Sequence, residues 1–318
     1  MYYCAFQSQQ LKAQLCASST VILLDSIIYT EPFSWQLVFE DNFDGTSLDL
    51  SNWEQRPWSN GSIDGSDAYR TLNNVTVSPE TFYGRSTSAK GVCVITAKKE
   101  NVTEHSTSWD PSSPIVTYQY TASDVWSKQQ FGWGKYEIRC KLPKSKSLWS
   151  SFWMYGEKDG IGHEIDGFEF TNEHTITGKY DPNKTSKVAQ MHYHRWDKTF
   201  TNNSIDHNCG SSVGNSNSTD FSEDFHTFTV IWNRFGIYWY IDNEYKKEAA
   251  QWYDINGHSV DINNIKPTQV VLRNDWFPKN PVSIIFALNI SKGNDAPDDS
   301  SVFPSSLIID YIRYYTPN

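Results

Sequence analysis

Short runs of alternating apolar and polar residues recur along most of this chain, and no segment keeps a helical period over several turns. Runs of this kind, rich in β-branched and aromatic residues, are typical of β-strands. Turn residues rather than helices separate them, which favours antiparallel pairing. The sequence therefore predicts an all-β fold, an antiparallel β-sandwich or barrel. The expected strands include 91–97, 135–142, 225–232, 236–242, 282–288 and 307–315.

The length of 318 residues favours one domain, because all-β sandwiches often exceed ~200 residues as a single unit. We assign residues 31–318 to this domain. Residues 1–30 are set apart as an N-terminal segment, a leader or a disordered stretch, since Asp25 interrupts their short apolar run. That run is too short for a membrane helix. The polar segments 104–114 and 199–224 are predicted to be surface loops.

Charge and cysteine content exclude several classes of protein. The formal net charge is −10 and no basic patch is present, so nucleic acid is not an expected partner. The five cysteines form no CxxC pair and show no zinc spacing, so neither a disulfide framework nor a zinc finger is predicted. Cys93 and Cys140 fall in predicted strands and are expected to be buried thiols.

Three acidic residues, Glu164, Asp166 and Glu169, fall within one strand-like segment. Residues i and i+2 of a strand face the same side, so Glu164 and Asp166 share a face while Glu169 has the opposite parity. One extra residue, a β-bulge, would return Glu169 to that face. Gly167 favours a bulge at this position. The sequence therefore predicts three carboxylates on one face of a bulged strand.

Neighbouring carboxylates raise one another's pKa, which suits glycoside hydrolysis by one ionised and one protonated group. In retaining enzymes the two groups lie ~5–5.5 Å apart. The Cα atoms of Glu164 and Glu169 would lie about 13 Å apart along the strand, so side-chain reach and curvature must close the gap. A solvated acidic strand explains the acids alone equally well. The apolar residues between them, Ile165 and Phe168, give the strand a core face and favour a site.

The segment 164–169, Glu-Ile-Asp-Gly-Phe-Glu, resembles the bulged motif of glycoside hydrolase family 16, the form typical of laminarinases, agarases, porphyranases and carrageenases. Residues 38–45 resemble the opening strand of that family, 131–137 a strand of "YGxxE" type and 309–315 its closing strand. The resemblance covers nearly the whole chain from Trp35. It implies a jelly-roll sandwich, concanavalin-like, with a sugar cleft on its concave face.

The resemblance also implies roles for individual residues. Glu164 would be the nucleophile, Glu169 the general acid/base, and Asp166 would lie between them and tune the nucleophile. No cofactor is implied for catalysis. Asp310 matches a position that often binds a structural calcium ion in the family, although one carboxylate does not make a calcium site.

Aromatic and histidine side chains are the candidates for sugar binding. Any one of the 13 tryptophans could serve the core or stack on a sugar ring. By the resemblance Trp149 and Trp153 flank the cleft, with Trp126 and Trp133 as weaker candidates. Two histidines, His192 and His194, share a face of a following strand. They form either a metal-free, hydrogen-bonded surface pair or a pair with one member near Glu169 or a sugar hydroxyl.

The expected function is endo-acting, retaining hydrolysis of a β-linked polysaccharide, with β-1,3(4)-glucan slightly favoured. An endo-β-galactanase activity, as in agarases, porphyranases, carrageenases or host-glycan endo-β-galactosidases, is the alternative within this class. The substrate assignment stays open because Gly160 to His163 replace the Trp-Pro-rich run of laminarinases. A lectin-like sandwich without catalysis is the alternative from another class, but it needs neither Glu164 nor Glu169. The expected partner is a polysaccharide or oligosaccharide. The resemblance implies an extracellular or cell-surface location, and we expect a monomer without a transmembrane segment.

Overall fold

The computed structural model describes residues 21–22, 34–56, 68–79, 91–106, 110–171, 186–197, 205–208, 219–233, 236–250, 252–254, 271–273 and 280–318. Regular structure in these ranges is β-strand, apart from the short 3-10 helices η1 (Leu72–Asn74) and η4 (Gly293–Asp295). None of the described helices is long and apolar enough to cross a membrane.

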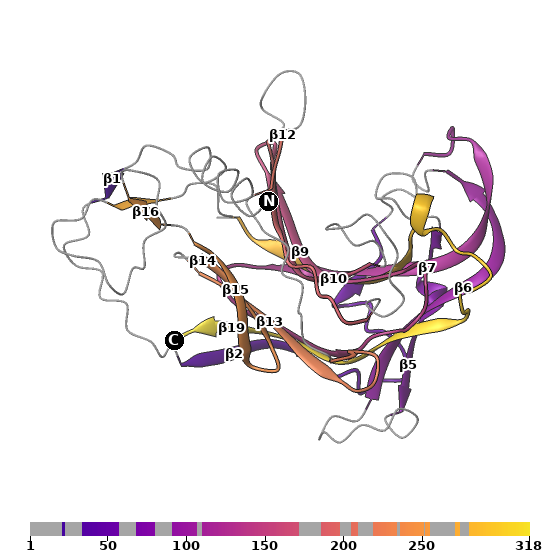
Figure 1. The fold of residues 1–318 in the computed structure, drawn as a ribbon, viewed down its shortest axis with the longest axis horizontal. Coiled ribbons are helices and arrows are strands. Elements are labelled where there is room, and N and C mark those ends of the chain that lie inside the picture. The colour runs from indigo at the N-terminus through magenta and orange to yellow at the C-terminus, as the bar shows by residue number, and fades with distance from the viewer. Residues whose placement is uncertain are drawn as a thin grey trace, which may run out of the picture.

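Two curved layers of strands pack face to face (Figure 1). Their hydrogen bonding is continuous, in the order β12-β11-β10-β9-β18-β7-β6-β19-β8-β13-β14-β15. The first layer consists of β12 (Ile205–Asn208), β11 (Tyr193–Asp197), β10 (Ile161–Phe170), β9 (Leu148–Lys158), β18 (Val282–Ile290) and β7 (Ile115–Phe131). The second consists of β6 (Gly91–His105), β19 (Ser305–Pro317), β8 (Gly134–Lys141), β13 (His226–Trp232), β14 (Gly236–Ile241) and β15 (Glu244–Ala250).

Shorter strands extend these layers. β2 (Trp35–Asp41) pairs with β19, β5 (Val75–Pro79) with β6, and both β3 (Trp53–Glu54) and β4 (Tyr69–Arg70) with β7. A separate three-stranded sheet contains β1 (Val21–Ile22), β17 (Val271–Arg273) and β16 (Trp252–Asp254). Among the described strands, every pair is antiparallel except β4 with β7. The predicted antiparallel β-sandwich is confirmed.

All six expected strands are present, as β6, β8, β13, β14, β18 and β19. The predicted loop 104–114 is shorter than expected, because β6 continues to His105 and β7 begins at Ile115. The predicted loop 199–224 contains the strand β12 and otherwise lies largely outside the described residues. Residues 1–30 also lie outside them apart from β1, so the assignment of a leader or disordered segment and of a single domain stays a prediction.

Aromatic side chains fill the space between the layers. On β10, Ile165, Phe168 and Phe170 point inward and are at most 3% exposed. The Phe168 ring packs against Phe228 of the opposite layer, with ring centroids 4.5 Å apart. Burying side chains of this size contributes about 1.5–3 kcal/mol each, so this face fixes β10 firmly on the core. Elsewhere Cys93 and Cys140 are buried free thiols, as predicted.

Candidate active site

Strand β10 changes register at Gly167. Asp166 pairs with Trp153 of β9, whereas Phe168 pairs with the adjacent Phe152, so Gly167 is the extra residue of a β-bulge. A Cβ atom at Gly167 would lie 2.5 Å from Cδ1 of Phe152, a distance that real contacts do not allow. Glycine is therefore required by the close approach of the core beneath the bulge.

The bulge places the acidic side chains on the outer face of β10, away from the core. Ile165 before the bulge and Phe168 after it are both fully buried, so the inward positions change parity between them. Glu164 and Asp166 alternate with Ile165, and Glu169 alternates with Phe168. The predicted bulge and the shared face of the three carboxylates are confirmed.

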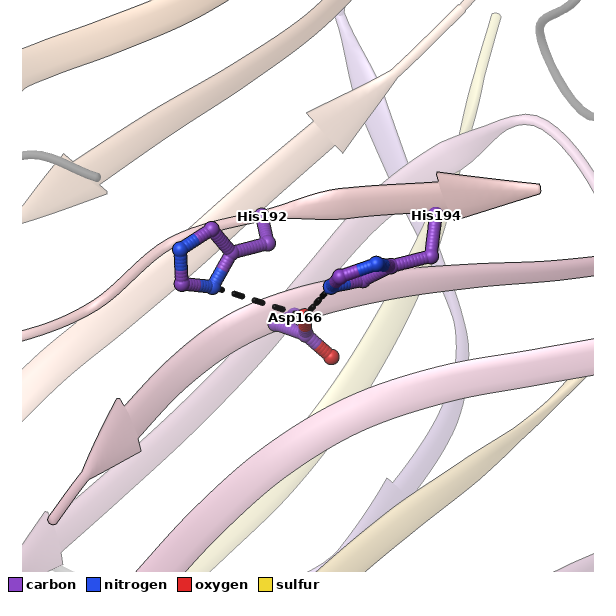
Figure 2. Close-up of side chains that lie close together, drawn as sticks. All are labelled: Asp166, His192 and His194. Carbon is purple, nitrogen blue, oxygen red and sulfur yellow. Dashed lines mark ion pairs between the residues drawn. The ribbon is translucent and has the colours of Figure 1, made fainter. Parts of the chain in front are cut away.

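Asp166 lies at the centre of the group, between two histidines (Figure 2). Its Oδ2 atom is 3.4 Å from Nε2 of His194 and 3.8 Å from Nδ1 of His192. Burial and the nearby charge of Glu169 raise the pKa of Asp166 to about 6, against the opposing effect of the two histidines. The Asp166 carboxyl group therefore titrates near neutral pH.

Glu169 is held by groups from two neighbouring segments. The indole Nε1 of Trp149 on β9 donates a 3.0 Å hydrogen bond to Oε1 of Glu169. The other carboxylate oxygen, Oε2, is 3.5 Å from Nδ1 of His192. The side chain of Glu169 keeps 22% of its surface exposed. An oriented carboxyl group that solvent and substrate can still reach is suited to proton transfer.

A row of aromatic side chains continues from Asp166 across the first layer. The register joins Asp166 to Trp153, Trp153 to Ile285, and Ile285 to Trp126. The rings of Trp153 and Trp126 meet edge to face, with centroids 5.3 Å apart. Tyr155 lies 6.3 Å from both rings. An aromatic surface beside carboxylates is the arrangement expected of a sugar-binding cleft.

The model of glycosyl hydrolases family 16 matches residues 86–276, which is more than half of the chain. The chain belongs to glycoside hydrolase family 16. The family assignment makes this protein a glycoside hydrolase, as predicted from the bulged motif.

Individual relatives agree with this family assignment. A glucan endo-1,3-beta-glucosidase of Cryptopygus antarcticus is 26% identical over 258 residues, 78% of this chain and 84% of that protein. A keratan-sulfate endo-1,4-beta-galactosidase of Sphingobacterium multivorum is 24% identical over 209 residues, 62% of this chain and 40% of that protein. The laminarinase catalytic domain from Thermotoga petrophila RKU-1 superposes with a TM-score of 0.60 at 24% identity, covering 90% of this chain and 100% of that one. This likeness confirms the jelly-roll fold.

The two weaker sugar-binding candidates of this family 16 hydrolase, Trp126 and Trp133, differ in their exposure. Trp126 is only 3% exposed and donates a 2.7 Å hydrogen bond to Asp124, so it lies within the aromatic row rather than at its surface. Trp133 is 45% exposed, but it lies in the turn between β7 and β8 and is outside the row of cross-strand partners. The half-buried Trp149 and Trp153 remain the candidates for contact with sugar.

Sequence reasoning missed two residues of this surface. Tyr155 follows Trp153 by two positions on β9, so strand parity alone could have identified it. Arg56 places its guanidinium 4.6 Å from the ring centroid of Trp126 and pairs with Glu54 at 2.9 Å. No local pattern indicated Arg56, because its contact arises from the pairing of β3 with β7. By contrast His163 has the opposite strand parity to Glu164, so it faces inward, where its Nδ1 atom lies 2.8 Å from the hydroxyl of Tyr193.

Asp310 does not fit the calcium site implied by the family. Its carboxylate is fully buried and pairs with the guanidinium of Arg139. Calcium takes 6–8 oxygen ligands, and a fixed cation at the same carboxylate opposes its binding. The described surroundings of Asp310 therefore make a buried ion pair, and no calcium-dependent step is assigned to it.

Proposed function

We propose that this family 16 protein is an endo-acting, retaining hydrolase of β-1,3-linked glucan, with Glu164 as nucleophile and Glu169 as general acid/base. The observation that carries the proposal is the bulge at Gly167, which brings Glu164, Asp166 and Glu169 to one face of β10. Trp149 and Trp153 on the adjacent strand supply apolar ring surface next to these acids. Two carboxyl groups are what glycosidic cleavage requires, and the aromatic rings beside them offer a surface for the sugar.

In the first step, Glu169 gives its proton to the glycosidic oxygen while a Glu164 oxygen attacks the anomeric carbon. The leaving alcohol departs and a glycosyl ester forms on Glu164. In the second step, Glu169 removes a proton from water, which attacks the same carbon and releases Glu164. The two inversions give retention. Trp149 orients the Glu169 carboxyl group throughout, since its indole N–H is already bonded to it.

Glucan is favoured over galactan as the substrate by the extent of similarity. The glucan endo-1,3-beta-glucosidase aligns over 78% of this chain, whereas the keratan-sulfate galactosidase aligns over 62%. A lectin without catalysis is disfavoured, because it requires neither Glu164 nor the oriented Glu169. A polysaccharide does not diffuse across a membrane, so we propose that the protein acts outside the cell.

Azide rescue distinguishes the two proposed roles. Glu164→Ala and Glu169→Ala should each abolish laminarin hydrolysis while laminarin binding persists. With an activated aryl β-glucoside oligosaccharide, azide should restore turnover of Glu169→Ala and give the β-glycosyl azide. The same treatment of Glu164→Ala should give the α-glycosyl azide, because azide replaces the missing carboxylate and inverts the anomeric carbon once as the aryl group leaves. NMR of the wild-type reaction identifies the anomer that is released first. Release of the inverted anomer would refute Glu164 as nucleophile.

The substrate is tested by incubating the protein with laminarin, mixed-linkage glucan, agarose and κ-carrageenan and separating the products. Laminarin should be cut into a ladder of oligosaccharides from the start, as endo cleavage requires. Cleavage of a galactan in preference to laminarin would establish the galactanase alternative. Binding to a glycan with no cleavage of any would establish the lectin.

A further inference from the structure

Two histidines and one aspartate converge on β10 and the neighbouring segment, as Figure 2 shows. One of them, His192, lies 3.5 Å from the proposed acid/base Glu169. The potential ligand atoms of Asp166, His192 and His194 all lie within 4.8 Å of one another. The main-chain N–H of Asp166 donates a 2.9 Å hydrogen bond to the carbonyl of His192, which fixes the two segments side by side. The backbone segments that carry the three side chains therefore lie directly beside each other.

The spacing of these atoms fits a metal ion. For ligands at about 2.1 Å around a tetrahedral ion, neighbouring ligand atoms lie about 3.4 Å apart. The contacts of Asp166 Oδ2 with the ring nitrogens of His194 and His192 measure 3.4 Å and 3.8 Å. Oε2 of Glu169 lies 3.5 Å from the same His192 nitrogen and so adjoins the remaining coordination position.

One oxygen of the buried Asp166 carboxylate, Oδ2, makes only long contacts with its neighbours. Its side chain is 3% exposed, and Oδ2 has no hydrogen-bond partner among the described residues. The contacts with His192 and His194 are longer than the 2.7–3.2 Å of a well-formed N–H···O bond. A buried carboxylate oxygen that makes only these long contacts is poorly satisfied, and a cation between it and the two imidazoles would satisfy it.

We propose that Asp166, His192 and His194 bind a divalent transition-metal ion of the Zn²⁺ type. Two imidazoles and one carboxylate are ligands that Zn²⁺ accepts, whereas Ca²⁺ and Mg²⁺ prefer sets of oxygens alone. An ion bound there engages Asp166 and adjoins Glu169, so it inhibits hydrolysis. The inhibition rests on the proposed function, but the binding does not.

Binding is measured directly by titrating Zn²⁺ into chelator-treated protein in a calorimeter. One Zn²⁺ per chain should bind, and excess Ca²⁺ should not compete. His194→Gln should weaken binding by at least about tenfold, since even loss of an outer-shell partner costs that much. The matched control is His226→Gln, because His226 pairs with Asp242 at 2.7 Å on the opposite layer. Equal affinity in both variants, or no binding to the wild type, would overturn the proposal.

X-ray absorption at the zinc edge tests the wild-type protein without any variant. The spectrum should show two imidazole ligands together with oxygen ligands at about 2.0–2.2 Å. Spectra without imidazole scattering would exclude the site even if His194→Gln failed to fold. Activity of the chelator-treated protein separates the two claims: a protein that binds Zn²⁺ but does not hydrolyse laminarin even when metal-free would refute the proposed function alone. Active enzyme that binds no Zn²⁺ would refute the metal site alone.

Discussion

The indole Nε1 of Trp239 on β14 donates a 2.7 Å hydrogen bond to the main-chain carbonyl of Asp166 on β10. The bond crosses the core from the second layer to the first. A β-bulge disrupts the ladder locally and leaves backbone groups in need of other partners. Trp239 supplies such a partner at the bulge, so the position of the acidic residues depends on both layers of the sandwich.

Trp239→Phe should destabilise the protein and lower its activity. The substitution leaves the buried carbonyl of Asp166 without its donor, which costs about 1–3 kcal/mol in addition to the lost ring volume. Urea unfolding and laminarin hydrolysis measure the two effects. Trp232→Phe is the matched control, because Trp232 is equally buried and its Nε1 has no hydrogen-bond partner among the described residues. A similar loss in both variants would show that the bond to Asp166 contributes nothing.

Gly167→Ala should reduce the free energy of unfolding by about 1–3 kcal/mol, the usual cost of overpacking. The new methyl group would meet the Phe152 ring and carbonyl within 3.0 Å, so either the core or the bulge must shift. Gly132→Ala is the control, since a Cβ atom there has no neighbour within 4 Å. If the two alanine variants unfold at the same urea concentration, the close approach at Gly167 is not a constraint.

Trp149→Phe should lower kcat for laminarin by about 10- to 100-fold, since a hydrogen bond to a charged group contributes about 1.5–3 kcal/mol. The phenyl ring keeps apolar surface beside Glu169, so KM should change much less than kcat. Trp153→Phe, on the same strand and face, should change KM much more than kcat. A Trp149→Phe enzyme with unchanged kcat would exclude the indole N–H as the group that orients Glu169.

Asp220 should contribute to stability at neutral pH and lose that contribution in acid. Burial opposes its ionisation, but hydrogen bonds from Lys144, Ser186 and Ser222 outweigh burial and lower the pKa of Asp220 well below its usual range. A carboxyl pKa that is lower in the folded than in the unfolded state stabilises the protein at pH values above the unfolded pKa of about 3.9. This stabilisation is lost as the pH falls from that value through the folded pKa.

Asp220→Asn should therefore be less stable than the wild type at pH 7, and the difference should shrink between about pH 4 and pH 2. Urea midpoints across this range measure the effect. Asp299→Asn is the control: it removes the same charge from an exposed aspartate, and the urea midpoint should keep the pH dependence of the wild type. A difference in urea midpoint between wild type and Asp220→Asn that stays constant with pH would contradict the lowered pKa of Asp220.

The sequence by itself determined the strands and the face of the acids. Strand parity is a local property, so the alternation around Ile165 and the glycine after Asp166 were sufficient to predict the bulge. The buried state of Cys93 and Cys140 followed from the same alternation.

The tertiary structure decided which side chains meet across strands. Trp126 and Trp133 looked alike in the sequence, yet only Trp126 joins the row that contains Trp153. Likewise, the approach of His192 to Glu169 and the pairing of Asp310 with Arg139 join residues that lie far apart along the chain. Register between distant strands is set by the packing of both layers, and no local pattern encodes it.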